Sequence, residues 1–219
     1  MRCTDGSCPS RRRSATDRGG LTSAAGILLA GGASRRFGRD KLREPIDGEP
    51  LFWRPLRALR ACDEVVIVLA PGAAELPLPP NASQARFARD DVAHGGPLVG
   101  VRTGLAEVRA PLAAIAGADM PGLRAELLAL MARHATTSGK SAVVLGDSDW
   151  SHPLPAVVKT KAAVDLAAAL LGGGERRLRA LMGALDALVL PERVWAKVDP
   201  DGEWRRDVDV LGDLPTKRG

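Results

Sequence analysis

Continuous runs of hydrophobic residues recur along the chain, separated by segments rich in glycine, proline and charged residues. Because these runs are short and lack alternating polar positions, they are typical of strands that are covered on both faces of a parallel sheet. They predict strands at 24–30, 65–69, 112–116, 142–145 and 156–158, with shorter strands at 85–88 and 187–190.

Helical spacing of hydrophobic residues is found in the segments between these runs. Leu51, Leu56 and Leu59 predict a helix within 51–61, and a proline-rich loop follows the next strand at 71–80. Regular alternation of strands and helices predicts an α/β fold, a three-layer sandwich around a Rossmann-like, mainly parallel sheet. The other predicted helices are at 97–108, 123–135, 162–171 and 176–187.

The composition suits one globular domain. The chain has 219 residues, of which 45% are hydrophobic and 26% charged, and this is enough to bury one core. Residues 1–23 are rich in Ser, Thr, Arg and Gly and have no hydrophobic period, so we expect a disordered basic extension there. A single domain over 24–215 is the prediction for the rest.

The net charge of +5 is located at the two ends of the chain. Five arginines against two aspartates in 1–24, together with Lys217 and Arg218, account for all of it, which leaves 25–216 neutral. The chain has no tyrosine and only 3% aromatic residues, so it lacks the stacking platforms of single-strand nucleic-acid binding. We therefore expect no nucleic-acid partner.

Cysteine usage and hydrophobic length predict a cytoplasmic protein with no membrane partner. Cys3, Cys8 and Cys62 cannot form an even disulfide framework and have the wrong spacing for a zinc site, so free thiols in a reducing compartment are expected. The arginines at 11–13 before the run at 24–30 imitate a signal peptide. That run is at the lower limit of length for such a segment, however, and no run is long enough to span a membrane.

The loop after the first predicted strand carries the strongest chemical signal, because ligands of such sheets collect at the carboxyl ends of strands. Positions 29–41 read L-A-G-G-A-S-R-R-F-G-R-D-K. Gly31 and Gly32 allow backbone N–H groups to approach an anion, Ser34 offers a hydroxyl, and Lys41 with three arginines supplies positive charge for a polyphosphate. The spacing fits neither the dinucleotide fingerprint nor the P-loop.

This segment resembles the signature L-A-G-G-x-S-x-R-M-G-x-D-K of molybdenum cofactor guanylyltransferases and related nucleotidyltransferases. Nine specified positions match, and Phe37 replaces the usual methionine. The resemblance implies the GT-A-like nucleotidyltransferase type of sheet, catalytic roles for Arg36 and Lys41, and nucleotide binding by this loop. The nucleotide-binding residues that it implies here are Leu29, Ala30, Gly31, Gly32, Ser34 and Lys41.

Two later segments resemble the nucleoside-binding parts of the same family. Residues 96–100 read G-P-L-V-G, similar to the family's G-P-L-A-G, and imply nucleotide contacts by Gly96, Pro97, Leu98 and Gly100. Helix N-termini suit such contacts, although glycine and proline also open helices without any ligand. Asp90 or Asp91 corresponds to an aspartate near the nucleoside, and the variable loop length leaves open which one.

Metal and acceptor positions follow toward the C-terminus. Asp119 begins a D-M-P sequence similar to the family's C-D-M-P, which implies that its carboxylate holds Mg²⁺; capping the next helix is the alternative. Residues 151–155 resemble the family's H-P-L-P turn near the second substrate, but a single histidine such as His152 is more often structural. Aspartates replace the family's asparagines at 207 and 209, and Asp209 is a candidate second metal ligand.

The resemblance implies transfer of GMP from GTP to the phosphate of a molybdopterin-type acceptor, with Mg²⁺ as cofactor and release of pyrophosphate. It also implies transient contact with molybdenum-insertion proteins or molybdoenzymes. The pair Gly31-Gly32 favours GTP, whereas the aspartates at 207 and 209 look more like the cytidylyl branch. A cytidylyltransferase or another nucleotidyltransferase with a different phosphorylated acceptor, and a nucleotide-binding homologue without catalysis, are the alternatives.

Overall fold

A seven-stranded sheet forms the centre of the molecule, whose computed structural model describes residues 21, 23–31, 40–93, 95–147 and 151–208. Its strands are β1 (Ala24–Leu29), β4 (Glu64–Leu69), β5 (Ala85–Arg89), β6 (Leu112–Gly117), β7 (Ala142–Gly146), β8 (Ser151–Lys159) and β9 (Leu188–Leu190). They lie in the order β5-β4-β1-β6-β8-β7-β9. Only β8 is antiparallel to its neighbours, so the sheet is mainly parallel, as the sequence predicts.

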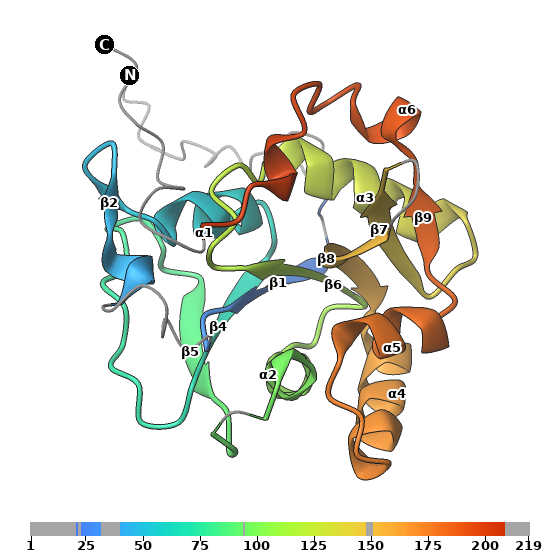
Figure 1. Cartoon of the computed structure of the whole chain (residues 1–219), viewed down its shortest axis with the longest axis horizontal. Helices are drawn as coiled ribbons and strands as arrows, with labels where there is room; N and C mark the ends of the chain where they lie inside the picture. The colour runs from blue at the N-terminus through green and yellow to red at the C-terminus, as the bar shows by residue number, and fades with distance from the viewer. Residues whose placement is uncertain (1–20, 22, 32–39, 94, 148–150, 209–219) are drawn as a thin grey trace, which may run out of the picture.

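Helices cover both faces of this sheet, which confirms the predicted three-layer sandwich (Figure 1). Helices α1 (Trp53–Leu59) and α3 (Ala125–Thr137) pack on one face, and α2 (Pro97–Glu107), α4 (Thr160–Gly172) and α5 (Leu178–Ala184) pack on the other. Each face has its own hydrophobic core. The strands alternate between the two cores, so Leu28 of β1 faces α1 and α3 while Ile27 faces α2.

The close approach of α2 to the sheet depends on a glycine. A Cβ built on Gly104 would lie 2.5 Å from Ile27 Cγ2, so no larger residue fits there without movement. Burial on both faces explains why β1 and β4 contain no alternating polar residues. It also explains why their positions could be predicted from the continuous hydrophobic runs in the sequence.

The structure differs from the sequence prediction in the start of one strand and in several short elements. Strand β8 starts at Ser151, five residues before the predicted strand, so the predicted turn at 151–155 forms the first half of β8. The sequence prediction also missed several short elements, which have too few residues for a hydrophobic period. These are η2 (Lys41–Arg43), the hairpin β2 (Pro45–Ile46) and β3 (Glu49–Pro50), α6 (Glu192–Trp195) and η3 (Glu203–Arg205).

Two residues of the predicted extension contact the domain. Leu21 is fully buried in the core on the α1 and α3 face, and the Ser23 N–H donates a hydrogen bond of 3.0 Å to the Asp63 carboxylate. The folded unit therefore includes Leu21. The division of the chain into 1–23 and 24–215 stays a prediction, because 1–20 and 209–219 lie outside the described residues.

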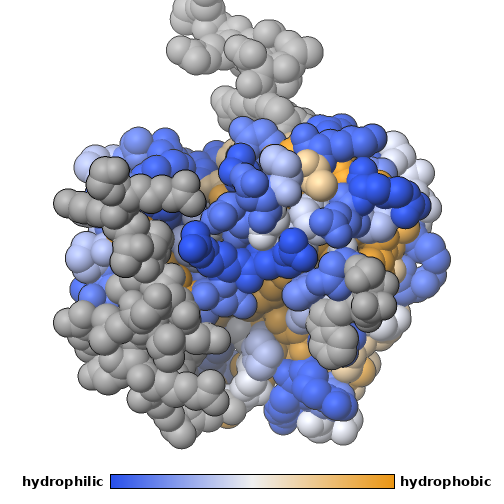
Figure 2. Space-filling view, turned by 45° about the horizontal axis from the view of Figure 1, so that its top comes forward, coloured by the Kyte–Doolittle hydropathy of each residue, from blue (hydrophilic) through white to orange (hydrophobic). Residues whose placement is uncertain are grey.

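Surface charges of both signs are paired with one another. Ion pairs join Arg43 to Asp40, Arg86 to Glu64 and Arg206 to Glu203, among others. Figure 2 shows one face on which hydrophilic residues predominate, with hydrophobic residues in the hollow near its middle. Among the described helices, none combines the length and hydrophobicity that crossing a bilayer requires.

Candidate active site

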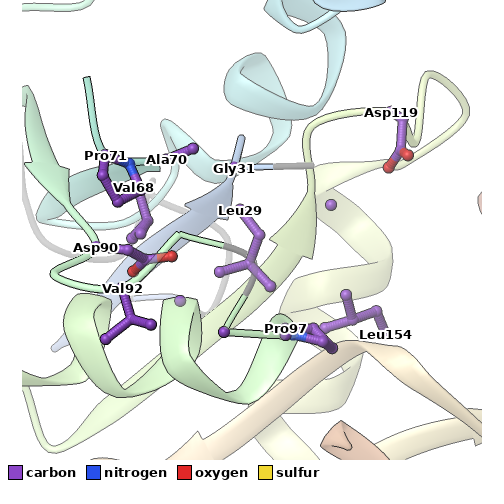
Figure 3. A pocket seen from close by; sticks show the side chains of 14 residues that line it. Leu29, Gly31, Val68, Ala70, Pro71, Asp90, Val92, Pro97, Asp119 and Leu154 are labelled. Carbon is purple, nitrogen blue, oxygen red and sulfur yellow. The ribbon is translucent and has the colours of Figure 1, made fainter. Parts of the chain in front are cut away.

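A cavity of about 360 Å³ lies at the carboxyl ends of the parallel strands (Figure 3). After β5 the chain crosses to β6 on the other side of β1, so the strand order reverses next to β1, and ligands of α/β sheets bind at such points. Several of the residues named from the sequence line it. The lining residues are Leu29, Gly31, Val68, Ala70, Pro71, Asp90, Val92, Gly95, Gly96, Pro97, Gly100, Gly117, Asp119 and Leu154.

The end of β1 is fixed between its two neighbouring strands. The Ala30 N–H donates to the Val68 carbonyl at 2.8 Å, and the Ala118 N–H donates to the Leu29 carbonyl at 3.0 Å. A Cβ on Gly31 would lie 3.3 Å from the backbone nitrogen of Ala70, so the chain can turn into the cavity most easily with glycine there. The turn therefore places the Gly31 backbone against the cavity. Gly32, Ser34 and Arg36 lie outside the described residues.

The start of α2 forms a second side of the cavity. Gly96 is the N-cap and has a φ of 84°, a conformation that favours glycine, and Pro97 follows in the first turn. Arg176 lies against this turn, since its carbonyl accepts a hydrogen bond of 3.3 Å from the Leu98 N–H. The Leu98 side chain is fully buried and does not line the cavity. Helix α2 thus presents its first turn to any ligand in the cavity.

Asp90 and Asp91 have opposite surroundings. Asp90 lines the cavity (Figure 3), and its Oδ1 is buried without a hydrogen-bond partner among the described residues. Burial is the main cause that raises the pKa of Asp90, and Thr103 and Arg102 partly oppose it. The Asp91 side chain is 87% exposed and lies 3.7 Å from Arg102. Only Asp90 is placed to contact a ligand in this cavity.

Lys41 and Asp119 are brought together although 78 residues separate them. The Lys41 ammonium donates to Asp119 Oδ2 at 2.8 Å and to the Val208 carbonyl at 2.9 Å. Lys41 belongs to η2, whose first turn is capped by the Asp40 carboxylate through a bond of 3.2 Å from the Leu42 N–H. The side chains of Lys41 and Asp119 are 12% and 31% exposed, so water still reaches the carboxylate.

The turn after β6 determines how Asp119 is presented. A Cβ on Gly117 would lie 2.6 Å from Asp119 Oδ1, so the carboxylate lies over the glycine. The Asp119 carbonyl accepts a hydrogen bond of 3.2 Å from the Val208 N–H. Asp119 is not the N-cap of α3, because that position belongs to Arg124. The alternative reading of Asp119 as a helix cap is therefore wrong.

The donor chemistry at Asp119 suits Mg²⁺. Hard carboxylate oxygens are the ligands that Mg²⁺ prefers, and it commonly uses one or two carboxylates together with substrate phosphates and water. Within the described ranges there is no group of three or more His, Cys, Asp or Glu that could hold a metal ion. A site built on Asp119 would thus depend on the substrate for further ligands. Asp209, the candidate second ligand, lies outside those ranges.

An aromatic cluster that the sequence analysis missed lies beside the first residues of β8. The Trp204 ring is fully buried and meets the rings of Trp195 and His152 edge to face, at centroid distances of 5.5 and 5.0 Å. The Arg205 guanidinium lies over the Trp195 ring at 5.0 Å, and His152 Nε2 lies 3.5 Å from Asp147 Oδ2. No hydrophobic period marks these residues, and the rarity of aromatic residues in this chain is the one signal that could have drawn attention to them.

Comparisons with known proteins show similar sequences over most of this chain. Residues 26–188 match the model of the MobA-like NTP transferase domain. A "Probable molybdenum cofactor guanylyltransferase" of Mycobacterium avium (strain 104) is 38% identical over 190 residues, which cover 83% of this chain and 93% of that protein. The protein of the same name from Mycobacterium tuberculosis (strain ATCC 25618 / H37Rv) is 38% identical over 170 residues, covering 75% of this chain and 81% of that protein.

Two solved structures share the fold. Molybdopterin-guanine dinucleotide biosynthesis protein A from Archaeoglobus fulgidus has a TM-score of 0.70 and 21% identity, covering 87% of this chain and 94% of that one. The 2-C-methyl-D-erythritol 4-phosphate cytidylyltransferase from Thermus thermophilus has a TM-score of 0.61 and 19% identity, covering 86% of this chain and 94% of that one. The nucleotidyltransferase type of fold predicted from the sequence is thereby confirmed.

Proposed function

The chain belongs to the MobA-like NTP transferase family, and from this premise we propose that it transfers GMP from GTP to the phosphate of a molybdopterin acceptor. Pyrophosphate is the second product, and the reaction serves molybdenum cofactor biosynthesis. The observation that carries the proposal is the contact of 2.8 Å between Lys41 and Asp119 at the carboxyl end of the sheet, where Asp119 lines the cavity.

The reaction requires positioning and charge neutralisation rather than a protein nucleophile. An oxygen of the acceptor phosphate forms a bond to the α-phosphorus of GTP, and the bond from that phosphorus to the bridging oxygen breaks, so that pyrophosphate leaves with the electron pair. The acceptor phosphate is already ionised near neutral pH, so no general base is needed. Aligned donors and positive charge are then the main sources of rate.

Four residues in or beside the cavity have separate tasks in this reaction: Gly31, Asp90 and Asp119 line it, and Lys41 contacts Asp119. Lys41 stabilises negative charge on the phosphates, and the backbone at Gly31 offers close approach to them. The unpartnered oxygen of Asp90 accepts a hydrogen bond from the nucleoside. Asp119 would hold Mg²⁺, which when bound supplies further neutralisation of the triphosphate charge. Roles for Gly32, Ser34, Arg36 and Asp209 follow from the family resemblance alone.

A cytidylyl specificity is the second candidate, and one observation favours it. The segment Asp207-Val208-Asp209 carries aspartates where guanylyltransferases usually have asparagines, and Val208 contacts both Lys41 and Asp119. Gly31-Gly32 favours GTP, and we give it more weight because Gly31 lines the cavity itself.

Release of pyrophosphate from each of the four nucleoside triphosphates tests the proposal. The purified protein is mixed with Mg²⁺ and molybdenum-loaded molybdopterin, and we expect release with GTP alone. Release with CTP alone would establish the cytidylyl alternative. GTP binding without any release would establish a nucleotide-binding homologue that lacks catalysis.

Two variants connect the activity to the site. Asp119→Asn should lower turnover by about 10²–10³-fold while GTP still binds, because a preorganised charged group is removed from the reacting phosphates. Glu126→Gln is the matched control, since Glu126 is a carboxylate in the first turn of α3 and does not line the cavity. It should leave turnover unchanged.

We also propose that the protein acts in the cytoplasm, without nucleic-acid or membrane partners, and passes its product on through transient contact with molybdenum-insertion proteins or molybdoenzymes. The neutral charge of 25–216 and the ion pairs of the described surface support the absence of a nucleic-acid partner.

A further inference from the structure

The Lys41 ammonium is the cationic partner of the Asp119 carboxylate in this structure. Its Nζ is 2.8 Å from Asp119 Oδ2, which is the contact distance of a charge-assisted hydrogen bond. The Asp119 carboxylate is also the one that is expected to hold Mg²⁺ during nucleotidyl transfer. One carboxylate therefore has two prospective cationic partners, the Lys41 ammonium and the metal.

Three segments of the chain hold Lys41 in this position. The capped turn of η2 supplies the lysine, the turn after β6 supplies Asp119, and the segment after η3 supplies the Val208 carbonyl, which accepts from Lys41 Nζ at 2.9 Å. The Val208 N–H in turn donates to the Asp119 carbonyl at 3.2 Å. The same short stretch of backbone thus holds both the lysine and the aspartate.

A lysine ammonium and a divalent cation cannot share the Asp119 carboxylate without cost. Both are positive, and the 12% exposure of the Lys41 side chain means that water screens their repulsion only partly. A nucleoside triphosphate changes this balance, because its phosphates offer the ammonium a new anionic partner. They also bring several oxygen ligands for the metal.

We propose that Lys41 is an internal counter-ion that occupies the metal position of Asp119 until a nucleoside triphosphate arrives. Lys41 then moves from Asp119 to the phosphates, and the metal takes its place. Free metal accordingly binds weakly to the nucleotide-free protein, and metal and nucleotide strengthen each other's binding by the same factor, since such coupling is reciprocal. The inference rests on the proposed function only in taking Asp119 as the metal ligand.

Binding of Mn²⁺ to the nucleotide-free protein, followed by electron paramagnetic resonance, tests the proposal without any catalysis. Lys41→Met removes the competing charge and should tighten Mn²⁺ binding by about tenfold or more, since a charge at this distance shifts the occupancy of a carboxylate by at least that factor. Lys41→Arg is the matched control, because it keeps the charge and should bind Mn²⁺ as weakly as the wild type. Asp119→Asn should abolish binding in either background.

Thermal unfolding of every variant shows whether it is folded, and Lys41→Gln provides a second neutral variant with a hydrogen-bonding side chain. The proposal is overturned if a folded Lys41→Met or Lys41→Gln protein binds Mn²⁺ no more tightly than the wild type. If the Lys41 variants bind Mn²⁺ more tightly but the wild type transfers no nucleotide, this inference stands and the proposed function is refuted. If the wild type transfers GMP but the Lys41 variants bind Mn²⁺ as weakly as the wild type, the proposed function stands and this inference is refuted.

Discussion

Substitution of Gly122 is expected to lower activity without touching any group that meets the substrate. Gly122 lies in the turn after Asp119, and a Cβ built there would be 2.5 Å from the Glu203 carbonyl carbon and closer still to the Glu203 carbonyl oxygen. Both partners are backbone, so no side chain can rotate to relieve the contact. An alanine forces Glu203 and the turn apart by at least about 0.9 Å, because the carbonyl carbon alone must move that far to reach the 3.4 Å of ordinary contact.

That displacement reaches the candidate active site through Val208. The segment from Glu203 leads in five residues to Val208, whose backbone bonds to Lys41 and Asp119 have lengths of 2.9 and 3.2 Å. A shift near 1 Å at a positioning group costs on the order of 10²-fold in turnover. Crowding of this kind also destabilises a fold by about 1–3 kcal/mol. We therefore expect Gly122→Ala to lose about 10²-fold in kcat and to unfold at a lower temperature.

Gly183→Ala separates this effect from a general response to alanine. Gly183 lies in α5, and a Cβ there would have no atom within 4 Å, so the substitution should leave kcat unchanged and stabilise the helix by about 0.5–1 kcal/mol. The assay is pyrophosphate release at saturating substrates, together with thermal unfolding, in which each kcal/mol shifts the midpoint by about 2–4 °C. Wild-type turnover in a folded Gly122→Ala protein would refute the link between this turn and the site.

Four further outcomes are expected. Asp90→Asn should weaken GTP binding by about tenfold in calorimetry, because a charged hydrogen-bond acceptor is lost. Burial raises the pKa of Asp90 above its value in the unfolded chain, so the charged form of Asp90 opposes folding. Asp90→Asn should therefore raise the melting temperature at pH 7 relative to wild type. This gain should disappear as the pH falls through the Asp90 pKa, where the wild-type side chain becomes neutral. Cys62 is buried and its pKa is raised to about 12, so peptide mapping should show it alkylated only after unfolding. Gly104→Ala crowds Ile27 and should destabilise the protein by about 1–3 kcal/mol, measured by urea unfolding, with nearly unchanged kcat.

The central sheet could be predicted because its strands are buried on both faces. The run at 65–69 contains no polar residue, because its residues alternate between two hydrophobic cores, and it is therefore easily recognised as a buried strand. The short elements around the site could not be predicted in this way. Helix η2 has three residues and the hairpin strands have two each, so their formation depends on contacts with distant parts of the chain.

Asp90 and Asp91 show where sequence reasoning ends within the site. Adjacent residues of an extended chain point in opposite directions, so the choice between them depends on where β5 ends and how it is aligned. Pairing of Leu69 with Arg89, and the hydrogen bond of 3.0 Å from the Asp90 N–H to the Leu69 carbonyl, direct Asp90 into the cavity. That alignment is a property of the assembled sheet and cannot be read from a pair of consecutive aspartates.

The segment 199–208 shows why a motif can be recognised from the sequence while the distant residues that hold it in place cannot. Asp119 is identified from a short local sequence, but the carbonyl that holds its lysine partner is 167 residues away from that lysine. Trp204 fixes this segment by packing against Trp195 and His152. The buried Asp199 carboxylate accepts a hydrogen bond of 3.0 Å from the backbone N–H of Trp204. Substitutions at these supporting residues should therefore act on catalysis through the position of Val208, although none of them belongs to a recognisable motif.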